Sequence, residues 1–148
     1  MSHISLTYHL IFSTHQRLPS IPIAHEREMY KFLFDFSTQR GVKIWRIGGM
    51  PDHIHILCDI PPKLSVADYV KLVKAETSKF MRTNPHFPYW DRWSEGYGAF
   101  SVDTESREDR INYIMSQKDH HGCRSFAEEY KDILQHYHIP TDRIDESL

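Results

Sequence analysis

The sequence predicts an α+β protein with a ferredoxin-like core, in which an antiparallel sheet of βαββαβ order carries two helices on one face and further helices follow. Two observations support this fold class. Four short runs are rich in β-branched and aromatic residues, as strands are. Two longer segments between them place apolar residues at spacings of three and four, as amphipathic helices do. Their order along the chain is that of the split βαβ motif.

Each element has a local signal in the sequence. The expected elements are strands at 4–12, 42–49, 53–60 and 99–103, and helices at 24–39, 65–82, 106–121 and 125–137. Gly41 is suited to end the first helix, and Ser65 is suited to cap the second. The turn Met50-Pro51-Asp52 joins two adjacent strands, which predicts a hairpin. We therefore expect one domain over residues 1–148.

Composition and charge narrow the class of protein. Hydrophobic residues make up 40% of the chain and charged residues 26%, which is typical of a globular domain. With no membrane-length apolar run and no signal peptide, we expect a cytoplasmic protein that does not bind membranes. The net charge is −2, but residues 119–148 hold three Lys/Arg against seven Asp/Glu, leaving 15 against 13 before them. The acidic segment 119–148, which ends in an acidic tail at about 138–148, therefore masks a slightly basic body over residues 1–118. This distribution permits nucleic-acid binding without indicating it.

Two histidines are the first candidate site residues. His53 and His55 lie two apart in an expected strand, so both side chains leave the same face while Ile54 and Ile56 leave the other. Imidazole is the commonest metal-binding side chain, and two neighbours can hold a divalent ion with positions open for substrate. The alternative is a pair of exposed strand histidines without a role. A second pair of this kind, at residues 136 and 138, falls in a frayed acidic segment and is not expected to bind metal.

A tyrosine is the second candidate. Ile111, Ile114 and Met115 mark the apolar side of the third helix. Tyr113 lies on the opposite, polar side, together with Gln117, Arg110 and His120, and is expected to project outward. A phenolate there could attack a phosphodiester, and the resulting phosphotyrosine would keep the bond energy for rejoining. The alternative is a partly exposed tyrosine without a special role.

Taken together, these segments resemble a known family. The histidine pair in GGMPDHIHIL, followed downstream by the pattern Tyr-x-x-x-Gln-x-x-His-His, is similar to the single-tyrosine HUH transposases of small bacterial insertion sequences. The segments YHLIF with Arg17 and Pro19 after it, KAETSKFMR and WSEGYGAFSV are similar to the same family. The resemblance runs from about Tyr8 to His121.

The resemblance implies a transposase that cleaves and rejoins single-stranded DNA. It implies Tyr113 as the nucleophile, which forms a 5′-phosphotyrosine and leaves a free 3′-hydroxyl. It also implies a divalent ion, Mg²⁺ or Mn²⁺, held by His53, His55 and Gln117. Members recognise DNA hairpins at element ends. They usually act as homodimers with active sites shared between subunits.

Further residues are candidates for DNA contacts. The third helix contributes Arg110 and His120, and the second helix contributes a polar stripe made of Lys71, Lys74, Ser78 and Arg82. The alternative for this stripe is a solvated helix face. The loop at 84–98 is rich in aromatic residues, which could stack on unpaired bases or could pin the loop to the core.

Three other functions remain open from the sequence. The first is a non-catalytic hairpin-binding module, such as a domesticated descendant of a transposase. The second is a nickase related to replication initiators, which would cut without rejoining. The third is a small metallohydrolase built on His53 and His55, although no general base is evident near the pair.

Overall fold

The computed structural model describes residues 1–120 and 125–141, with the side chain of His120 left aside. Its strands are β1 (Thr7–Ser13), β2 (Lys43–Met50), β3 (His53–Asp59) and β4 (Gly98–Val102). They form a sheet of order β2-β3-β1-β4, and every neighbouring pair is antiparallel. This order is that of the split βαβ arrangement, and it confirms the predicted fold class.

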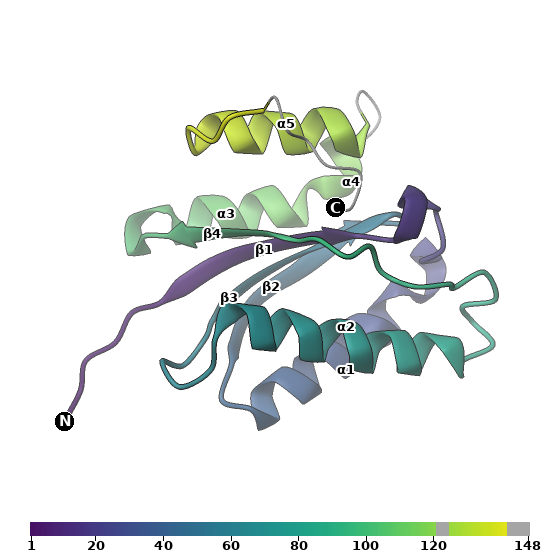
Figure 1. The fold of residues 1–148 in the computed structure, drawn as a ribbon, viewed down its shortest axis with the longest axis horizontal. Helices are drawn as coiled ribbons and strands as arrows, with labels where there is room; N and C mark the ends of the chain where they lie inside the picture. Colours follow the sequence, from purple (N-terminus) through teal and green to yellow (C-terminus); the bar gives the residue numbers. More distant parts are fainter. Residues whose placement is uncertain (121–124, 142–148) are drawn as a thin grey trace.

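The helices form two layers, one on each face of the sheet (Figure 1). The layer within the βαββαβ unit consists of α1 (Glu26–Gln39) and α2 (Val66–Arg82). The opposite layer consists of α3 (Arg107–Met115), α4 (Gln117–His120) and α5 (Phe126–His136). Short 3-10 turns lie at His15–Arg17, Ile23–His25 and Thr104–Ser106. Within the described residues, no helix is long and apolar enough to cross a membrane.

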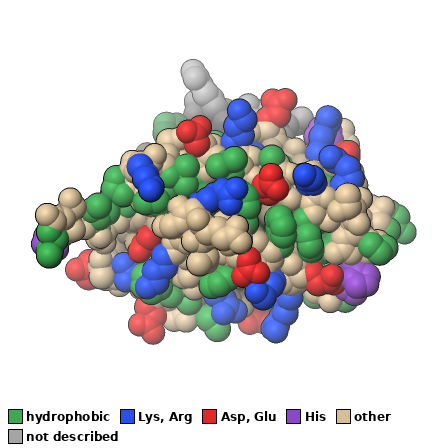
Figure 2. All heavy atoms as spheres, turned by 90° about the horizontal axis from the view of Figure 1, so that it is seen from below, with side chains coloured by type: hydrophobic (Ala, Val, Ile, Leu, Met, Phe, Trp, Pro, Cys, Tyr) green, Lys and Arg blue, Asp and Glu red, His purple; other side chains and the backbone are tan. Residues whose placement is uncertain are grey.

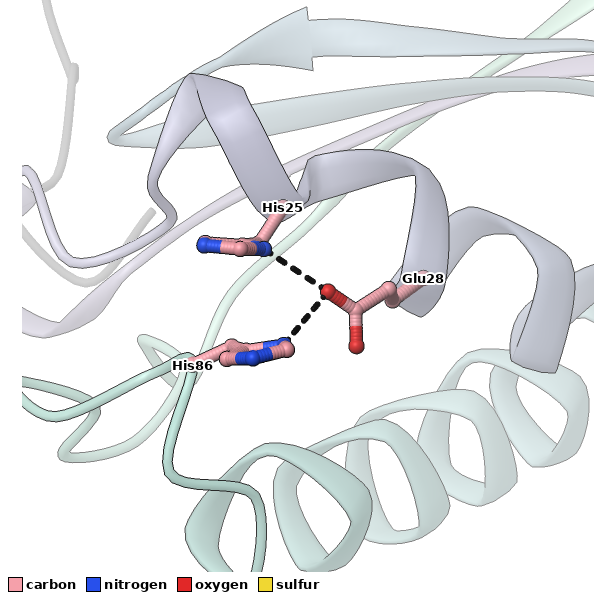
Figure 3. Close-up of side chains that lie close together, drawn as sticks. All are labelled: His25, Glu28 and His86. Carbon is pink, nitrogen blue, oxygen red and sulfur yellow. Dashed lines mark hydrogen bonds and ion pairs between the residues drawn. The ribbon is translucent and has the colours of Figure 1, made fainter.

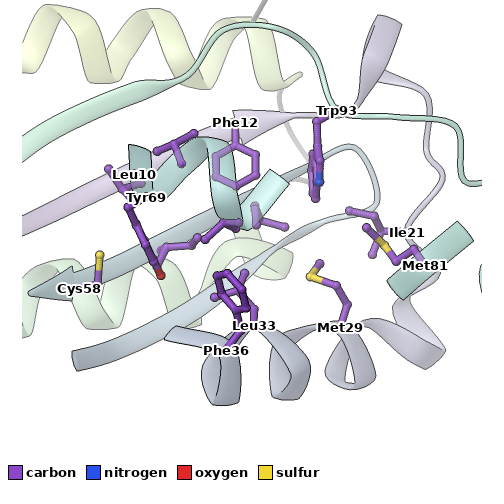
Figure 4. Packing of buried hydrophobic residues seen from close by; sticks show 14 of the residues in the cluster. Leu10, Phe12, Ile21, Met29, Leu33, Phe36, Cys58, Tyr69, Met81 and Trp93 are labelled. Carbon is purple, nitrogen blue, oxygen red and sulfur yellow. The ribbon is translucent and has the colours of Figure 1, made fainter. Parts of the chain in front are cut away.

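The largest hydrophobic core lies between the sheet and the α1–α2 layer (Figure 4). Leu10 and Phe12 of β1 and Ile54 and Ile56 of β3 all point into it and are fully buried. Cys58, on the same face of β3, also packs there, as a structural cysteine would, and burial raises the pKa of its thiol. This packing leaves the alternate side chains of the same strands to face α3, α4 and α5.

The sequence predicts a continuous third helix over residues 106–121 with Met115 on its buried side, and the structure corrects both points. The helix is interrupted at Ser116, so that α3 ends at Met115 and α4 begins at Gln117. Met115, expected on the buried side, is 55% exposed. A 3-10 turn at Thr104–Ser106 leads into α3, which begins at Arg107, one residue after the predicted start. Histidine 121 and cysteine 123 lie outside the described residues.

A glycine allows α3 to lie close against the sheet. A Cβ atom on Gly48 of β2 would stand 2.8 Å from both the side chain and the carbonyl oxygen of Ile114. That separation is closer than real Cβ contacts, so any larger residue would push α3 away. Ile114 itself is buried against Leu57 and Val102. Gly48 thus brings the tyrosine helix within reach of the histidine strand.

Candidate active site

The histidine pair lies side by side beneath the α3–α5 layer. His53 and His55 leave the same face of β3, as the strand periodicity predicts, and their ring centroids are 5.1 Å apart. Both side chains are fully buried. The alternative of two exposed histidines is therefore wrong. Buried polar groups require hydrogen-bond partners. The partners of the two rings therefore show which ring nitrogens are occupied and which are available to a bound ion.

The outer ring nitrogens of the pair are held by hydrogen bonds. His53 Nδ1 lies 2.7 Å from a carboxylate oxygen of Asp52, in the turn before β3. His55 Nδ1 lies 2.8 Å from Nε2 of His9, on β1. Such partners fix the orientation of metal-binding imidazoles and direct the other nitrogen to the ion. Here both Nε2 atoms are turned towards the same point under α5.

Tyr113 and Gln117 meet the histidines at this point. The ring of Tyr113 is 5.8 Å from that of His55 between centroids, and Gln117 Oε1 is 3.1 Å from His53 Nε2. The polar side of the third helix was expected to face outward, and this expectation is wrong. Gln117 is 1% exposed and Tyr113 is half-buried, because α5 covers this side. Arg110 stays beside Tyr113, with its guanidinium carbon 5.2 Å from the ring centroid.

Sequence reasoning missed Glu129, which α5 brings to the centre of the site. Its carboxylate oxygens lie 3.2 Å from His55 Nε2 and 3.5 Å from His53 Nε2. It also accepts hydrogen bonds from the hydroxyl of Tyr113 and, at 3.0 Å, from Nε2 of Gln117. The signal that could have found it is its position on the apolar stripe of the terminal helix, where a carboxylate is out of place.

His9 is the other residue that sequence reasoning missed. It is fully buried and lies on the same face of β1 as Ile11, the face opposite to Leu10 and Phe12. Its ring lies 5.1 Å from that of His55 and 6.3 Å from that of Tyr113. A histidine in the middle of a strand, between Tyr8 and Leu10 and two residues before Ile11, is the signal that could have identified it.

The charges of the buried groups differ sharply. Burial lowers the pKa of His55 to about 4 and that of His9 well below its ordinary value, so both rings are neutral at pH 7. Burial would also lower the pKa of His53, but hydrogen bonds to Asp52 and Glu129 raise it to about 9. Burial would raise the pKa of Glu129, but hydrogen bonds to both histidines hold it well below its usual range. The negative charge of the ionised Glu129 carboxylate is thus balanced by the positive charge of protonated His53.

The donor set of this site fits a divalent metal ion. Ligating atoms of His53, His55 and Glu129 all lie within 4.8 Å of one another, and all three side chains are fully buried. Gln117 adds an amide oxygen beside them. A mixed nitrogen and oxygen set of this kind suits Mn²⁺ and accommodates Mg²⁺. Metal binding would displace the proton of His53, because a ligating imidazole must be neutral.

His9 is expected to position His55 for metal binding. The variant His9→Phe keeps an aromatic ring but removes the hydrogen bond to His55 Nδ1. We expect Mn²⁺ affinity to fall by about ten- to a hundredfold, as it does when outer partners of ligands are lost. Isothermal titration with Mn²⁺ measures this, and His136→Phe, at an exposed position, serves as the control. Unchanged affinity in His9→Phe would show that the hydrogen bond does not orient the ligand.

A pocket of about 640 Å³ opens beside the site, between the turn after β1 and the loop before β4. Arg17, Arg92 and His15 line it, and Arg92 Nη2 lies 3.0 Å from His15 Nε2. Arg17 stands over the ring of Phe126, which in turn stacks on His53 with centroids 4.3 Å apart. Gln16 and Arg17 both adopt left-handed backbone conformations, with φ of 56° and 54°, which is uncommon outside glycine.

The polar stripe on α2 holds the loop that precedes β4. Lys74 donates hydrogen bonds to the backbone carbonyls of residues 94–96 at 2.7, 3.2 and 2.7 Å. Arg82 donates to the carbonyl of Asp91 at 2.8 Å, and Ser78 accepts from the indole of Trp90 at 3.0 Å. Lys71 is exposed. Three of the four residues of the stripe are thus engaged within the protein.

The aromatic residues of the loop at 84–98 also divide into those that contact the protein interior and those that face solvent. Phe87, Trp90 and Trp93 are buried in the core and pin the loop, whereas Tyr89 is 80% and Tyr97 38% exposed. Only the two tyrosines are free to stack on bases. Figure 2 views the α1–α2 side and shows basic and acidic side chains interspersed over it. That face therefore lacks the continuous positive charge that would favour DNA binding.

Lys74 is expected to stabilise the loop rather than to bind DNA. Removing its three hydrogen bonds in Lys74→Met should lower the free energy of unfolding by about 2 kcal/mol. The control Lys71→Met, one turn earlier and exposed, should change it by less than about 0.5 kcal/mol. Urea denaturation measures both. If Lys74→Met left stability unchanged but weakened hairpin binding and its salt dependence, the phosphate contact would be the correct interpretation.

The fold and the site together define an α+β protein in which a strand-borne histidine pair faces a helix-borne tyrosine and glutamine. The chain belongs to the IS200-like transposases, since the model of that family matches residues 2–117. It is therefore a member of a family of DNA-processing enzymes.

Individual relatives agree with this assignment. The chain is 27% identical to the ISDra2 transposase TnpA of Deinococcus radiodurans, over 77% of this chain and 85% of the relative. It is 26% identical to the transposase for insertion sequence element IS200 of Salmonella typhimurium, over 74% and 77% of the two chains. The structure of a REP-associated tyrosine transposase bound to a REP hairpin matches all of this chain and 94% of its own, with a TM-score of 0.63. That structure is only 12% identical, so its similarity concerns the fold.

Proposed function

We propose that this protein cleaves and rejoins single-stranded DNA at the ends of an insertion sequence through a 5′-phosphotyrosine on Tyr113. One observation carries the proposal: the hydroxyl of Tyr113 and ligating atoms of His53, His55 and Glu129 converge on a single buried point. A nucleophile adjacent to a metal-binding donor set is what phosphodiester transfer requires. The family assignment supports the same reaction.

In the proposed reaction, the oxygen of Tyr113 attacks the phosphorus atom of the scissile phosphodiester. The bond from phosphorus to the 3′-oxygen breaks, and that oxygen leaves with a proton as a free 3′-hydroxyl. Glu129 accepts a hydrogen bond from the tyrosine hydroxyl and so orients it, and the proton that Tyr113 loses balances the proton that the leaving 3′-oxygen gains. A 3′-hydroxyl attacking the phosphotyrosine reverses the step, rejoins DNA and releases Tyr113 without ATP.

A divalent ion, Mg²⁺ or Mn²⁺, would supply charge stabilisation at the phosphate. We assign its protein ligands to His53, His55 and Gln117, and add Glu129 as a carboxylate that the sequence did not reveal. Asp52 and His9 hold the outer nitrogens of the two histidines in place.

The DNA strand is proposed to enter along the pocket lined by Arg17, Arg92 and His15. These side chains are suited to hold phosphates. Arg17 contacts the ring of Phe126, and that ring stacks on His53. Tyr89 and Tyr97 have exposed rings available for base stacking. We expect the substrate ends to form hairpins, since a structural neighbour is a transposase bound to one.

The test uses single-stranded DNA that spans the flanks of the protein's own gene. We expect a protein–DNA adduct on a denaturing gel in Mg²⁺ or Mn²⁺, and ligation of the excised ends when a second cleaved strand is supplied. Nicking without rejoining would favour the replication-initiator-like nickase. Hairpin binding without any adduct would favour the non-catalytic module. Turnover of a small phosphodiester by Tyr113→Phe would favour the metallohydrolase.

The tyrosine and histidines meet within one chain, which bears on the expected homodimer. The ring of Tyr113 lies 5.8 Å from that of His55 in the same chain, which supports a site completed within one chain rather than by a partner's tyrosine. We therefore expect that mixing Tyr113→Phe and His55→Ala proteins will not restore adduct formation. Quantitative adduct assays on the mixture and on each variant alone measure this. Recovery in the mixture would demonstrate the shared site of a homodimer.

A further inference from the structure

A second group of metal-ligating side chains lies away from the candidate active site, at the start of α1. It consists of His25 and Glu28 at the beginning of that helix and His86 in the loop after α2 (Figure 3). Nδ1 of His25 and Nδ1 of His86 each lie 2.8 Å from the same carboxylate oxygen of Glu28. The two imidazole rings are stacked, with centroids 4.0 Å apart and planes 16° from parallel.

This arrangement is more specific than a chance surface contact. The two rings are stacked and both direct Nδ1 at one carboxylate. The three ligating atoms lie within 4.8 Å of one another. Each histidine must donate its Nδ1 proton to the carboxylate when no ion is present. A metal ion would replace those two protons while keeping the same three partners.

The loop that carries His86 is held before any ion binds. The backbone amide of His86 donates to the side chain of Asn84 at 2.9 Å, and Asn84 also donates to Glu28 at 3.3 Å. The next residue, Phe87, is 3% exposed and anchors the turn in the core. His86 therefore presents its ring from a fixed turn, which lowers the entropic cost of assembling a site.

The chemistry of the three ligands selects the ion. Two imidazole nitrogens and one carboxylate are the ligand set of zinc sites with one open position. The candidate active site adds the amide oxygen of Gln117 to the same three kinds of donor, whereas this cluster consists of the three alone. The side chains are between 37% and 51% exposed, so an ion can enter from solvent. For zinc contacts of about 2.0–2.2 Å, the two stacked rings would turn so that both Nδ1 lone pairs point at the ion.

We propose that His25, Glu28 and His86 form a Zn²⁺ site that clamps the 84–97 loop to the start of α1. The site joins segments 58 residues apart in sequence, between Glu28 and His86. The same loop carries Arg92 and Trp93 of the pocket beside the candidate active site. Zinc at this position would stiffen the loop that borders the proposed DNA path, while the ion used in the reaction occupies a different place.

The test is the Zn²⁺ stoichiometry of the full-length protein, measured by titration against a chromophoric chelator. Wild type should bind one equivalent more than His86→Ala, and His136→Ala, which removes another exposed histidine, should match wild type. Loss of a direct ligand should weaken this site by at least about a hundredfold, since even outer partners cost ten- to a hundredfold. His86→Ala removes an exposed side chain, so it should fold normally.

Two further measurements locate the ion. A His53→Ala/His55→Ala protein, if folded by circular dichroism, should retain one Zn²⁺ equivalent that His86→Ala then removes. Zn²⁺ should slow hydrogen exchange of the 84–97 amides in wild type but not in His86→Ala. Equal stoichiometry in wild type and His86→Ala would overturn the proposal and leave the cluster as a hydrogen-bonded contact. These outcomes are independent of whether the protein cleaves DNA.

Discussion

Replacing Tyr113 with phenylalanine is expected to abolish the covalent DNA adduct while leaving hairpin binding nearly unchanged. The substitution removes one oxygen atom, the proposed nucleophile, and keeps the ring in its contacts with His9 and His55. Loss of a nucleophile typically lowers turnover by a factor on the order of 10³ or more. The adduct should therefore disappear from a denaturing gel, whereas fluorescence anisotropy with a hairpin oligonucleotide should report a similar Kd.

The structure offers a matched control for this experiment. Tyr89→Phe makes the same chemical change at an 80% exposed ring on the loop before β4, and it should form the adduct at the wild-type rate. The hydroxyl of Tyr113 also bonds to Glu129, so thermal melts should accompany the assay. Adduct formation by a well-folded Tyr113→Phe protein would exclude Tyr113 as the nucleophile.

Removing the metal or its ligand His55 is expected to have an effect of similar size. A chelator should abolish adduct formation by wild type, and added Mg²⁺ or Mn²⁺ should restore it. His55→Ala should stay inactive at every metal concentration, because it removes a neutral, fully buried imidazole whose Nε2 faces Glu129. We expect a loss on the order of 10³-fold, measured as the initial rate of adduct formation with saturating hairpin DNA.

Two comparisons make this result interpretable. His136→Ala changes an exposed histidine and should behave as wild type in the same assay. Gln117→Ala removes a weaker, uncharged donor, so part of its loss should be recovered at high Mn²⁺. If the chelator had no effect on wild type, the histidine pair would serve orientation or charge rather than metal binding, and the metal-dependent mechanism would be wrong.

The fold class and the main grouping of polar residues follow from the amino-acid sequence alone. A two-residue period in a strand requires His53 and His55 to share a face, and this holds in the structure. A four-residue spacing likewise brings Tyr113 and Gln117 to the same side of the chain despite the break at Ser116. Local geometry of this kind depends only on backbone periodicity, so it could be predicted without tertiary information.

The tertiary structure alone decided what covers these residues. Periodicity shows that Tyr113 and Gln117 share a side but not what packs on it, and α5 turned that side inward. Glu129 comes from 12 residues beyond Gln117, and His9 from 46 residues before His55. Lys74 binds carbonyls at residues 94–96 rather than pointing into solvent. Such contacts arise from long-range packing, whose partners no local pattern encodes, and for that reason the complete donor set became visible only in the folded chain.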